Sequence, residues 1–154
     1  MGWEIYHQMN NGKQKVFIKL QTKINDQDQN ETTTSNHYGT LLRRGKREVL
    51  LFNETADDGR NITNFITLQD NKVSIKRSGS VSMHQQFVVG KRTETMYEHI
   101  HGTIHLETYT KRLIYEPAEN SAGGTLNIDY TVLLNGQIER QHKLVLTYQE
   151  EDYS

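Results

Sequence analysis

The sequence predicts an all-β fold: a single closed or nearly closed antiparallel up-and-down β-barrel of about ten strands. Between residues 73 and 110, apolar side chains recur at every second position, as in strands with one buried face. Gly79, Gly90 and Gly102 divide this stretch at intervals of about a strand and a turn. No part of the sequence shows a helical period. A meander of this length is expected to curl and close, which removes its exposed edges.

Length and composition fit one barrel domain spanning residues 1–154. Apolar residues make up only 34 %, which suits a thin core or a partly polar interior. The net charge of −1 gives no overall attraction to nucleic acid or membrane. The lack of cysteine excludes disulfides and zinc–thiolate sites. We expect a cytoplasmic protein, because the sequence has no signal-peptide pattern and no apolar run of membrane-spanning length.

The strands before residue 73 are predicted from alternation and from polar breaks. Residues 1–14 carry little pattern and are expected to be loosely ordered, unless Trp3 and Tyr6 pack as a plug. The alternating residues 16–24 predict the first strand, and the polar run at 25–30 predicts a turn. Further strands are predicted at residues 32–42, 48–52 and 62–68.

Turn lengths follow from pairing apolar positions, because a slip of one residue moves every side chain to the other face of the sheet. The predicted turns are a two-residue type I′ turn at Asp70-Asn71, a two-residue turn at His101-Gly102, and three-residue loops at 77–79 and 134–136. They place opposite one another Leu68 and Val73, Ile75 and Val81, Tyr97 and Leu106, and Leu126 and Leu144.

The second half of the chain also carries a family signature. Its residues are Arg77-Ser78-Gly79, Val81, Met83, Gln85, Phe87, Gly90, Tyr97, Gly102, Leu106, Thr108 and Thr110, followed by Tyr130 and Leu146-Thr147-Tyr148. This set resembles the YwiB-like bacterial proteins from about residue 70 to the end. That family is a calycin-like (lipocalin-like) β-barrel domain of unknown function. The resemblance implies the barrel and no reaction. The spaced Gly-x-Trp of true lipocalins is replaced here by Gly2-Trp3.

The inward face of the predicted barrel is the first candidate site. It combines apolar and polar side chains, and buried polar groups need partners. Ordered water or one another would satisfy them, and so would a polar ligand. The candidate ligand-binding residues are Met83, Gln85, Phe87, Tyr97, His99, Thr108, Arg112 and Tyr130, with Thr95 and Thr110 on the same face.

Three histidines form the main cluster of metal-ligating residue types. Imidazole is a common metal ligand, but the predicted register puts His99 and His105 on opposite faces and His101 in the turn. We therefore predict no metal site. The sequence also shows no nucleophile with an adjacent base, no carboxylate pair and no glycine-rich phosphate loop. No catalytic residue and no cofactor are predicted.

Basic turns are the second candidate site. Successive turns of a meander alternate between its two ends, which places the tight glycine turns at one end and the basic turns at the other. The basic end is predicted to be the open one, and converging cations attract anions. The predicted anion-binding rim is Arg43, Arg44, Arg47, Lys91 and Arg92. The alternative is a solvated rim, neutralised by Glu150, Glu151 and Asp152.

These observations predict a non-catalytic protein that binds a small anionic ligand in or at the open end of the barrel. One alternative is a protein- or nucleic-acid-binding module that uses the basic rim. The absence of interleaved aromatic residues at Arg43–Arg47 weighs against single-strand binding there. The other alternative is an enzyme with an unrecognised pocket. No membrane partner is expected, and the oligomeric state does not follow from the sequence.

Overall fold

A computed structural model describes residues 12–119 and 122–151 as ten strands and no helix. In chain order the strands are β1 (Lys13–Asp26), β2 (Gln29–Arg44), β3 (Arg47–Thr55), β4 (Asn61–Leu68), β5 (Lys72–Gly79), β6 (Met83–Val88), β7 (Arg92–His99), β8 (Gly102–Pro117), β9 (Gly123–Leu134) and β10 (Ile138–Glu150). The first strand begins earlier than predicted, because Lys13 and Gln14 already pair with β2. The predicted plug residues Trp3 and Tyr6 lie outside the described residues.

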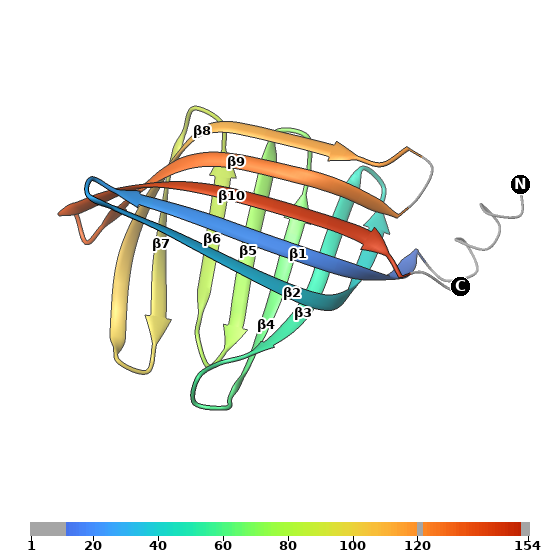
Figure 1. Cartoon of the computed structure of the whole chain (residues 1–154), viewed down its shortest axis with the longest axis horizontal. Coiled ribbons are helices and arrows are strands. Elements are labelled where there is room, and N and C mark those ends of the chain that lie inside the picture. The colour runs from blue at the N-terminus through green and yellow to red at the C-terminus, as the bar shows by residue number, and fades with distance from the viewer. Residues whose placement is uncertain (1–11, 120–121, 152–154) are drawn as a thin grey trace, which may run out of the picture.

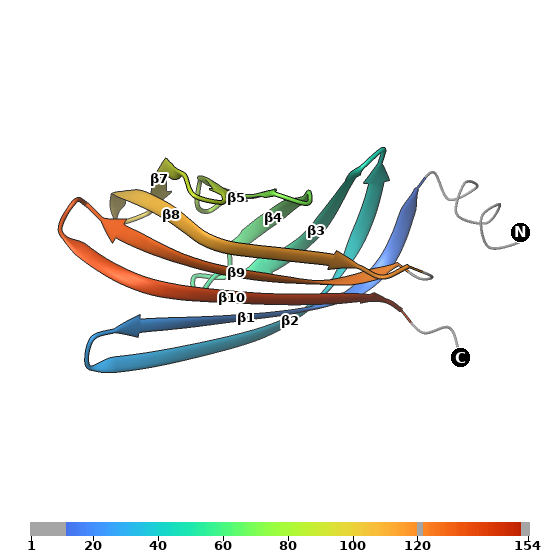
Figure 2. The same cartoon turned by 90° about the horizontal axis from the view of Figure 1, so that it is seen from above.

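The predicted antiparallel up-and-down meander is confirmed. The sheet order is β6-β5-β4-β3-β2-β1-β10-β9-β8-β7, so the first and last strands pair with each other at the centre of the ladder. Figures 1 and 2 show that β1, β2, β8, β9 and β10 form one layer, which crosses the layer of β3 to β7 at a steep angle. The core lies between these layers.

A β-bulge in β8 allows the chain to pass from one layer to the other. The pairing of β8 with β9 slips by one residue between Thr110 and Arg112, so Lys111 is an extra residue. Bulges bend a strand and increase its twist. Up to Tyr109, β8 pairs with β7 on one side, and beyond the bulge its regular pairing is with β9 alone.

The barrel is nearly closed, and its seam lies between β6 and β7. One backbone bridge joins the strands there, with Ser82 and Glu98 exchanging two hydrogen bonds of 2.9 Å. Further along the seam, side chains replace the backbone ladder. The Thr93 hydroxyl donates to the carbonyl of Gln86 at 2.7 Å, and the Thr95 hydroxyl donates to the carbonyl of His84 at 3.1 Å.

The predicted turn registers are right in parity and only partly right in detail. Leu68 does pair with Val73 around Asp70-Asn71. However, neither turn residue is among those with positive φ, so the turn is not type I′.

The other three turns each differ from the predicted position. Ile75 pairs with Gln85 instead of Val81, Tyr97 with Ile104 instead of Leu106, and Leu126 with Leu146 instead of Leu144. Each change is an even number of residues. The side chains that flank these turns therefore stay on the predicted face.

The core is a continuous set of apolar side chains from both layers. Its fully buried members include Val16, Ile18, Leu41, Leu50, Ile66, Leu68, Val73, Phe87, Leu126, Ile128 and Leu146. Four residues that were predicted to face inward do so: Phe87 and Tyr130 are buried, with ring centroids 4.8 Å apart, and Met83 and Leu106 pack against the core. Burial of each such large side chain contributes about 1.5–3 kcal/mol.

Gly79 is required for a reason that differs from the predicted three-residue turn. It lies at the end of β5 opposite Ile62, with φ of +109°. A β-carbon at this position would collide with the backbone carbonyl oxygen of Asn61.

We expect Gly79→Ala to destabilise the fold by about 1–3 kcal/mol more than Gly59→Ala. Both glycines have positive φ, but a β-carbon at Gly59 would meet nothing within 4 Å. The comparison therefore isolates the collision with Asn61 from the cost of the left-handed backbone. Urea unfolding of both variants measures the difference, and equal losses of stability would show that strand β4 moves freely away.

Candidate functional site

The exposure of inward-facing residues changes from one end of the barrel to the other. At the end that carries the β2–β3, β4–β5 and β6–β7 turns, Leu41, Leu68, Val73 and Phe87 are completely buried. At the opposite end, at the lower edge of Figure 1, inward residues are partly exposed. The prediction that the basic turns surround the open end is therefore wrong, because apolar side chains fill the interior behind them.

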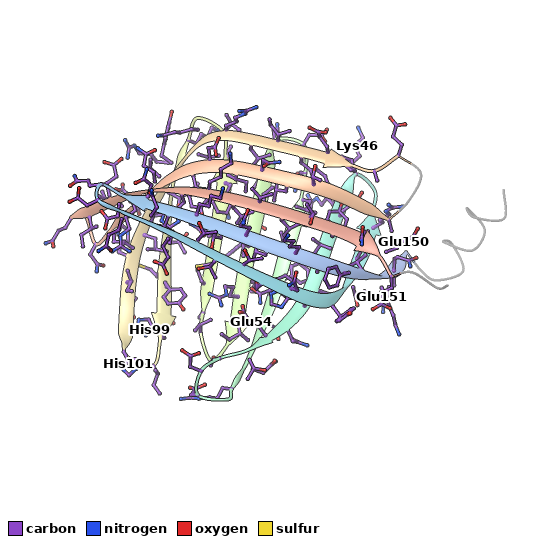
Figure 3. The ribbon with its side chains drawn as sticks, viewed as in Figure 1. Lys46, Glu54, His99, His101, Glu150 and Glu151 are labelled. Carbon is purple, nitrogen blue, oxygen red and sulfur yellow. The ribbon has the colours of Figure 1, made fainter. Side chains whose placement is uncertain are left out.

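The partly exposed end holds a set of polar side chains that we call the polar mouth. Its members are Ser35 and His37 on β2, Glu54 on β3, Asn64 on β4 and Arg77 on β5. The strand registers place all of them on the inward face. In Figure 3, Glu54 and His99 both lie toward this lower edge of the molecule, far from Lys46.

An ion pair lies at the centre of the polar mouth. One oxygen of Glu54, Oε1, accepts hydrogen bonds from Arg77 Nη2 and from Asn64 Nδ2, each at 2.8 Å. The two charged side chains are still 32 % and 25 % exposed. Burial alone would raise the pKa of the Glu54 carboxyl, but the hydrogen bond from Asn64 and the Arg77 guanidinium outweigh burial and lower the pKa.

His37 lies beside this ion pair and adds a second polar function. Its Nε2 is 2.9 Å from the hydroxyl of Ser35, and its ring lies over Phe52 with centroids 4.4 Å apart. Burial lowers the pKa of His37, although the Glu54 carboxylate opposes this shift. A neutral imidazole bonded to a serine hydroxyl resembles a nucleophile with its base. Among the described residues, no ion pair joins His37 to Glu54, so the imidazole has no carboxylate to orient it.

Two predicted interior residues, Gln85 and Thr108, are hydrogen-bonded to each other. Gln85 donates to the hydroxyl of Thr108 at 2.9 Å, linking β6 to β8 across the seam. Both side chains are buried, as are Thr95, which donates to the His84 carbonyl, and Thr110, whose hydroxyl has no hydrogen-bond partner within the described residues. Buried amide–hydroxyl pairs of this kind stabilise a fold without a ligand.

Other predicted interior residues face the polar mouth. Met83 pairs with Arg77, and the ring of Tyr97 lies 5.4 Å from that of His99, centroid to centroid. All three of Met83, Tyr97 and His99 are partly buried. Their predicted position inside the barrel is thus confirmed, and their role in ligand binding stays a prediction.

Arg112 does not face the interior as predicted. The bulge at Lys111 reverses the alternation, so Arg112 pairs with Asp129 on the outer face and is exposed. Leu113 and Tyr115 face inward in its place. An extra residue within a strand leaves no mark in a simple two-residue alternation, which explains the error.

The histidine cluster has the predicted arrangement. His99 Nδ1 accepts a hydrogen bond of 3.1 Å from the backbone of His101 in the turn. His105 faces outward, where its Nε2 is 3.8 Å from Glu94. Within residues 12–119 and 122–151, no three His, Cys, Asp or Glu side chains are grouped to hold a metal ion. No described helix is long and apolar enough to cross a membrane.

The predicted anion-binding rim is divided between two turns. Arg43, Arg44 and Arg47 belong to the β2–β3 hairpin, and Lys91 and Arg92 to the β6–β7 turn, with the β4–β5 hairpin between them in Figure 1. Arg43 approaches Glu48 at 3.8 Å, and Arg92 lies over the ring of Tyr109 at 5.5 Å.

A second inward polar network lies at the filled end, and sequence reasoning missed it. The Tyr148 hydroxyl donates to Glu48 Oε2 at 2.8 Å, so the Tyr115 hydroxyl, 2.7 Å away, donates to Tyr148. Burial holds the pKa of both phenols far above the ordinary range, which keeps them protonated donors. A β-carbon on Gly124 would lie 2.8 Å from the Tyr148 hydroxyl, so this glycine makes room for the phenol.

The charged residues of both networks could have been found from alternation. Glu48 and Glu54 occupy the same face of a strand as Leu50 and Phe52, and Arg77 occupies the same face as Val73 and Ile75. A charged residue at an apolar position of the repeat is the signal that was overlooked.

We expect Tyr148→Phe to lower the free energy of unfolding by about 1–3 kcal/mol, because Glu48 and Tyr115 both lose their buried partner. Tyr38→Phe serves as the control, because Tyr38 is 72 % exposed. Urea unfolding of the single variants and of Tyr148→Phe with Glu48→Gln measures the coupling. Additive losses would contradict the network.

Stability should fall as the pH decreases from about 6.5 to about 4. Burial, assisted by the charge of Arg140, lowers the pKa of His142 from 6.5 to about 4. The unfolded chain therefore binds a proton in this range that the folded chain rejects. The loss due to His142 should be on the order of 1–2 kcal/mol after allowance for its partial exposure.

Replacing His142 by Phe should flatten this part of the pH profile, because the ring stacked on Tyr130, 5.0 Å away, is kept and the titration is removed. His101→Phe, in an exposed turn, is the matched control. Urea unfolding at pH 7, 5.5 and 4 gives the slopes. A slope unchanged by His142→Phe would show that other groups cause the acid loss.

The fold and sequence are similar to those of known proteins. The solved structure titled "Crystal structure of ywiB protein from Bacillus subtilis" matches with a TM-score of 0.81 and 23 % identity, covering 94 % of this chain and 99 % of the other. The "Uncharacterized beta-barrel protein YwiB" of Bacillus subtilis (strain 168) is 27 % identical over 139 residues, which is 89 % of this chain and 96 % of the relative. The family model "Domain of unknown function (DUF1934)" matches residues 18–146. The chain therefore belongs to the DUF1934 family, a bacterial family of β-barrel proteins whose function is unknown.

Proposed function

We propose that this protein is a non-catalytic, cytoplasmic binding protein that holds a small organic anion, a carboxylate, at the polar mouth. The observation that carries this proposal is the Arg77 guanidinium, which lies on the inward face and is still reached by solvent. Its only hydrogen bond within the described structure runs from Nη2 to Glu54. The remaining guanidinium N–H groups are therefore free to bind a ligand.

The neighbours of Arg77 support a role in recognition. Glu54, which also accepts a hydrogen bond from Asn64, holds the guanidinium in place and so lowers the conformational entropy that Arg77 would lose on binding a ligand. A fixed guanidinium matches a carboxylate through two parallel hydrogen bonds. The neutral imidazole of His37 supplies one further polar contact. Met83 and Tyr97 offer apolar surface for the body of the ligand.

Binding is tested first on the protein as it is purified. Native mass spectrometry would detect a small molecule that accompanies the chain. Calorimetric titration with acetate, succinate and citrate then measures affinity. We expect Arg77→Gln to weaken binding at least tenfold. We expect Arg77→Lys to lose most of the affinity as well, because lysine cannot form the paired hydrogen bonds.

Two control variants separate the polar mouth from other cationic sites. Arg60→Gln removes an exposed arginine paired with Asp58 at 2.9 Å in the β3–β4 turn, and should bind as the wild type does. Arg44→Glu with Arg92→Glu tests the basic turns. Loss of binding in that variant and not in Arg77→Gln would place the anion at the basic turns. The absence of binding by any protein would overturn the proposal.

One observation favours an enzyme as the alternative: the Ser35–His37 hydrogen bond of 2.9 Å. An acyl-transfer enzyme would release p-nitrophenol from p-nitrophenyl acetate in a burst that Ser35→Ala removes. Turnover of this kind would replace binding as the function of the same mouth.

A further inference from the structure

The outer face of the β2-β1-β10 layer carries a row of exposed lysines. Lys15, Lys19 and Lys23 project outward from β1 at every fourth residue, and Lys143 projects outward from β10. Together with Phe17 and Tyr38, which share this outer face, they form what we call the lysine face. Successive lysines on β1 are about 13 Å apart, at 3.3 Å per residue.

Two of the three strands of the lysine face, β1 and β2, carry no acidic residue on their outward side. The outward positions of β1 and β2 hold no Asp or Glu; apart from the cations and the aromatic pair, they are mainly Thr, Asn and Gln, as at Gln21, Asn25, Asn30, Thr32, Thr34, Asn36 and Thr40. The whole chain has a net charge of −1, whereas the charged residues at the outward positions of β1 and β2 are all cations. Such a surface attracts polyanions.

Two of the lysines oppose each other directly. Lys23 pairs with Lys143 across β1 and β10, an arrangement that costs stability in an antiparallel sheet. Both line a hollow of about 330 Å³ on the outer face, together with Lys111 and Asp129. A single carboxylate among three lysines leaves the hollow positive. A pair that weakens the fold and lines a hollow is explained if an anion binds between the two ammonium groups.

An aromatic pair occupies the other part of the lysine face. Phe17 and Tyr38 make an edge-to-face contact with centroids 5.3 Å apart, and Tyr38 is 72 % exposed. They line a second hollow, of about 390 Å³, with Glu150 and Glu151. An exposed ring is a platform on which a nucleobase can stack. The neighbouring carboxylates can accept hydrogen bonds from a base amino group, as they do from cytosine.

We propose that the lysine face binds single-stranded nucleic acid, with phosphates at the lysines and a base on Tyr38. Phe17 and Lys23 are six residues apart on β1, a distance of about 20 Å. The ligand must therefore be an oligomer of several nucleotides to occupy both hollows. A duplex does not offer the unstacked base that the aromatic pair requires.

An anionic membrane fits this surface less well. Membrane-surface elements insert exposed apolar side chains beneath a ring of cations. On the lysine face, the exposed ring of Tyr38 stands among threonine and asparagine side chains. Those neutral polar groups suit hydrogen bonding to sugars and phosphates.

Fluorescence anisotropy of the full-length protein with fluorescein-labelled 12-nucleotide RNA and DNA of mixed sequence tests the proposal at 50 and 200 mM KCl. We expect binding at 50 mM and clear weakening at 200 mM. Lys19→Glu with Lys23→Glu should weaken binding at least tenfold. The slope of log affinity against log salt should become smaller by about 0.7 for each phosphate that is no longer neutralised by a lysine. Tyr38→Ala should also weaken binding about tenfold but leave the slope unchanged.

The choice of variants also tests whether a loss of binding comes from damage to the fold. Glu at position 23 would face Lys143 as an opposite charge, so Lys23→Glu should keep or raise the melting temperature while it weakens binding. Lys72→Glu with Lys76→Glu changes two exposed, outward lysines on β5 in the other layer, and should bind as the wild type does.

Three results would overturn the proposal. The first is the absence of oligonucleotide binding at 50 mM KCl. The second is equal weakening by the β5 control variant, which would indicate attraction to charge in general. The third is binding to vesicles of phosphatidylcholine and phosphatidylserine in a 3:1 ratio without binding to oligonucleotides, which would assign the lysine face to a membrane surface.

Discussion

The alternation of side chains across one continuous antiparallel ladder determines most of what this protein presents to a ligand. The ten strands pair in one continuous ladder from β6 through to β7. The positions that face inward on one strand therefore determine which positions face inward on the next. The inward orientation of Ile18 on β1 is therefore linked, through the strand registers, to the inward orientation of Arg77 on β5 and of Tyr148 on β10. The bulge at Lys111 exchanges the inward and outward positions within β8, at the point where the strand leaves β7.

The sequence predicted which face of the sheet most side chains occupy. It did not predict how deeply each side chain is buried along the axis of the barrel. Phe87 and Tyr130 were placed correctly, since alternation alone decides the face. Which end is filled depends on side chains that strands far apart in sequence bring into one core, such as Leu41 on β2 and Leu126 on β9, and alternation along a single strand does not reveal this. The turns moved by even steps because apolar positions repeat every two residues, so several registers satisfy the same pattern. The sequence analysis did not identify Glu54 and Arg77 as site residues, because charged side chains are rarely buried and because Arg77 was assigned to the loop at 77–79.

The two inward polar networks differ in how fully their hydrogen-bonding groups are used. At the filled end, the hydrogens of Tyr115 and Tyr148 are both committed, in a chain that ends on Glu48. A network that is satisfied in this way stabilises the fold and offers little to a ligand. At the polar mouth, Glu54 is satisfied by two donors but Arg77 donates from one nitrogen only. A buried charge without a partner is costly. Because Arg77 is partly exposed, water can hydrate the guanidinium N–H groups that do not bond to Glu54, and a ligand could take the place of that water.

The same β1–β2 hairpin supplies both surfaces, and its parity keeps them chemically separate. On β2, Ser35 and His37 face the polar mouth, whereas Asn36 and Tyr38 face the outer solvent. On β1, Lys19 and Lys23 point outward while Ile18 and Leu20 point toward the core. A substitution at an outward position thus changes the charge of one surface and leaves the hydrogen bonds of the other intact. The proposed small-molecule binding inside and the proposed polymer binding outside would depend on opposite faces of one sheet, so the loss of either would not imply the loss of the other.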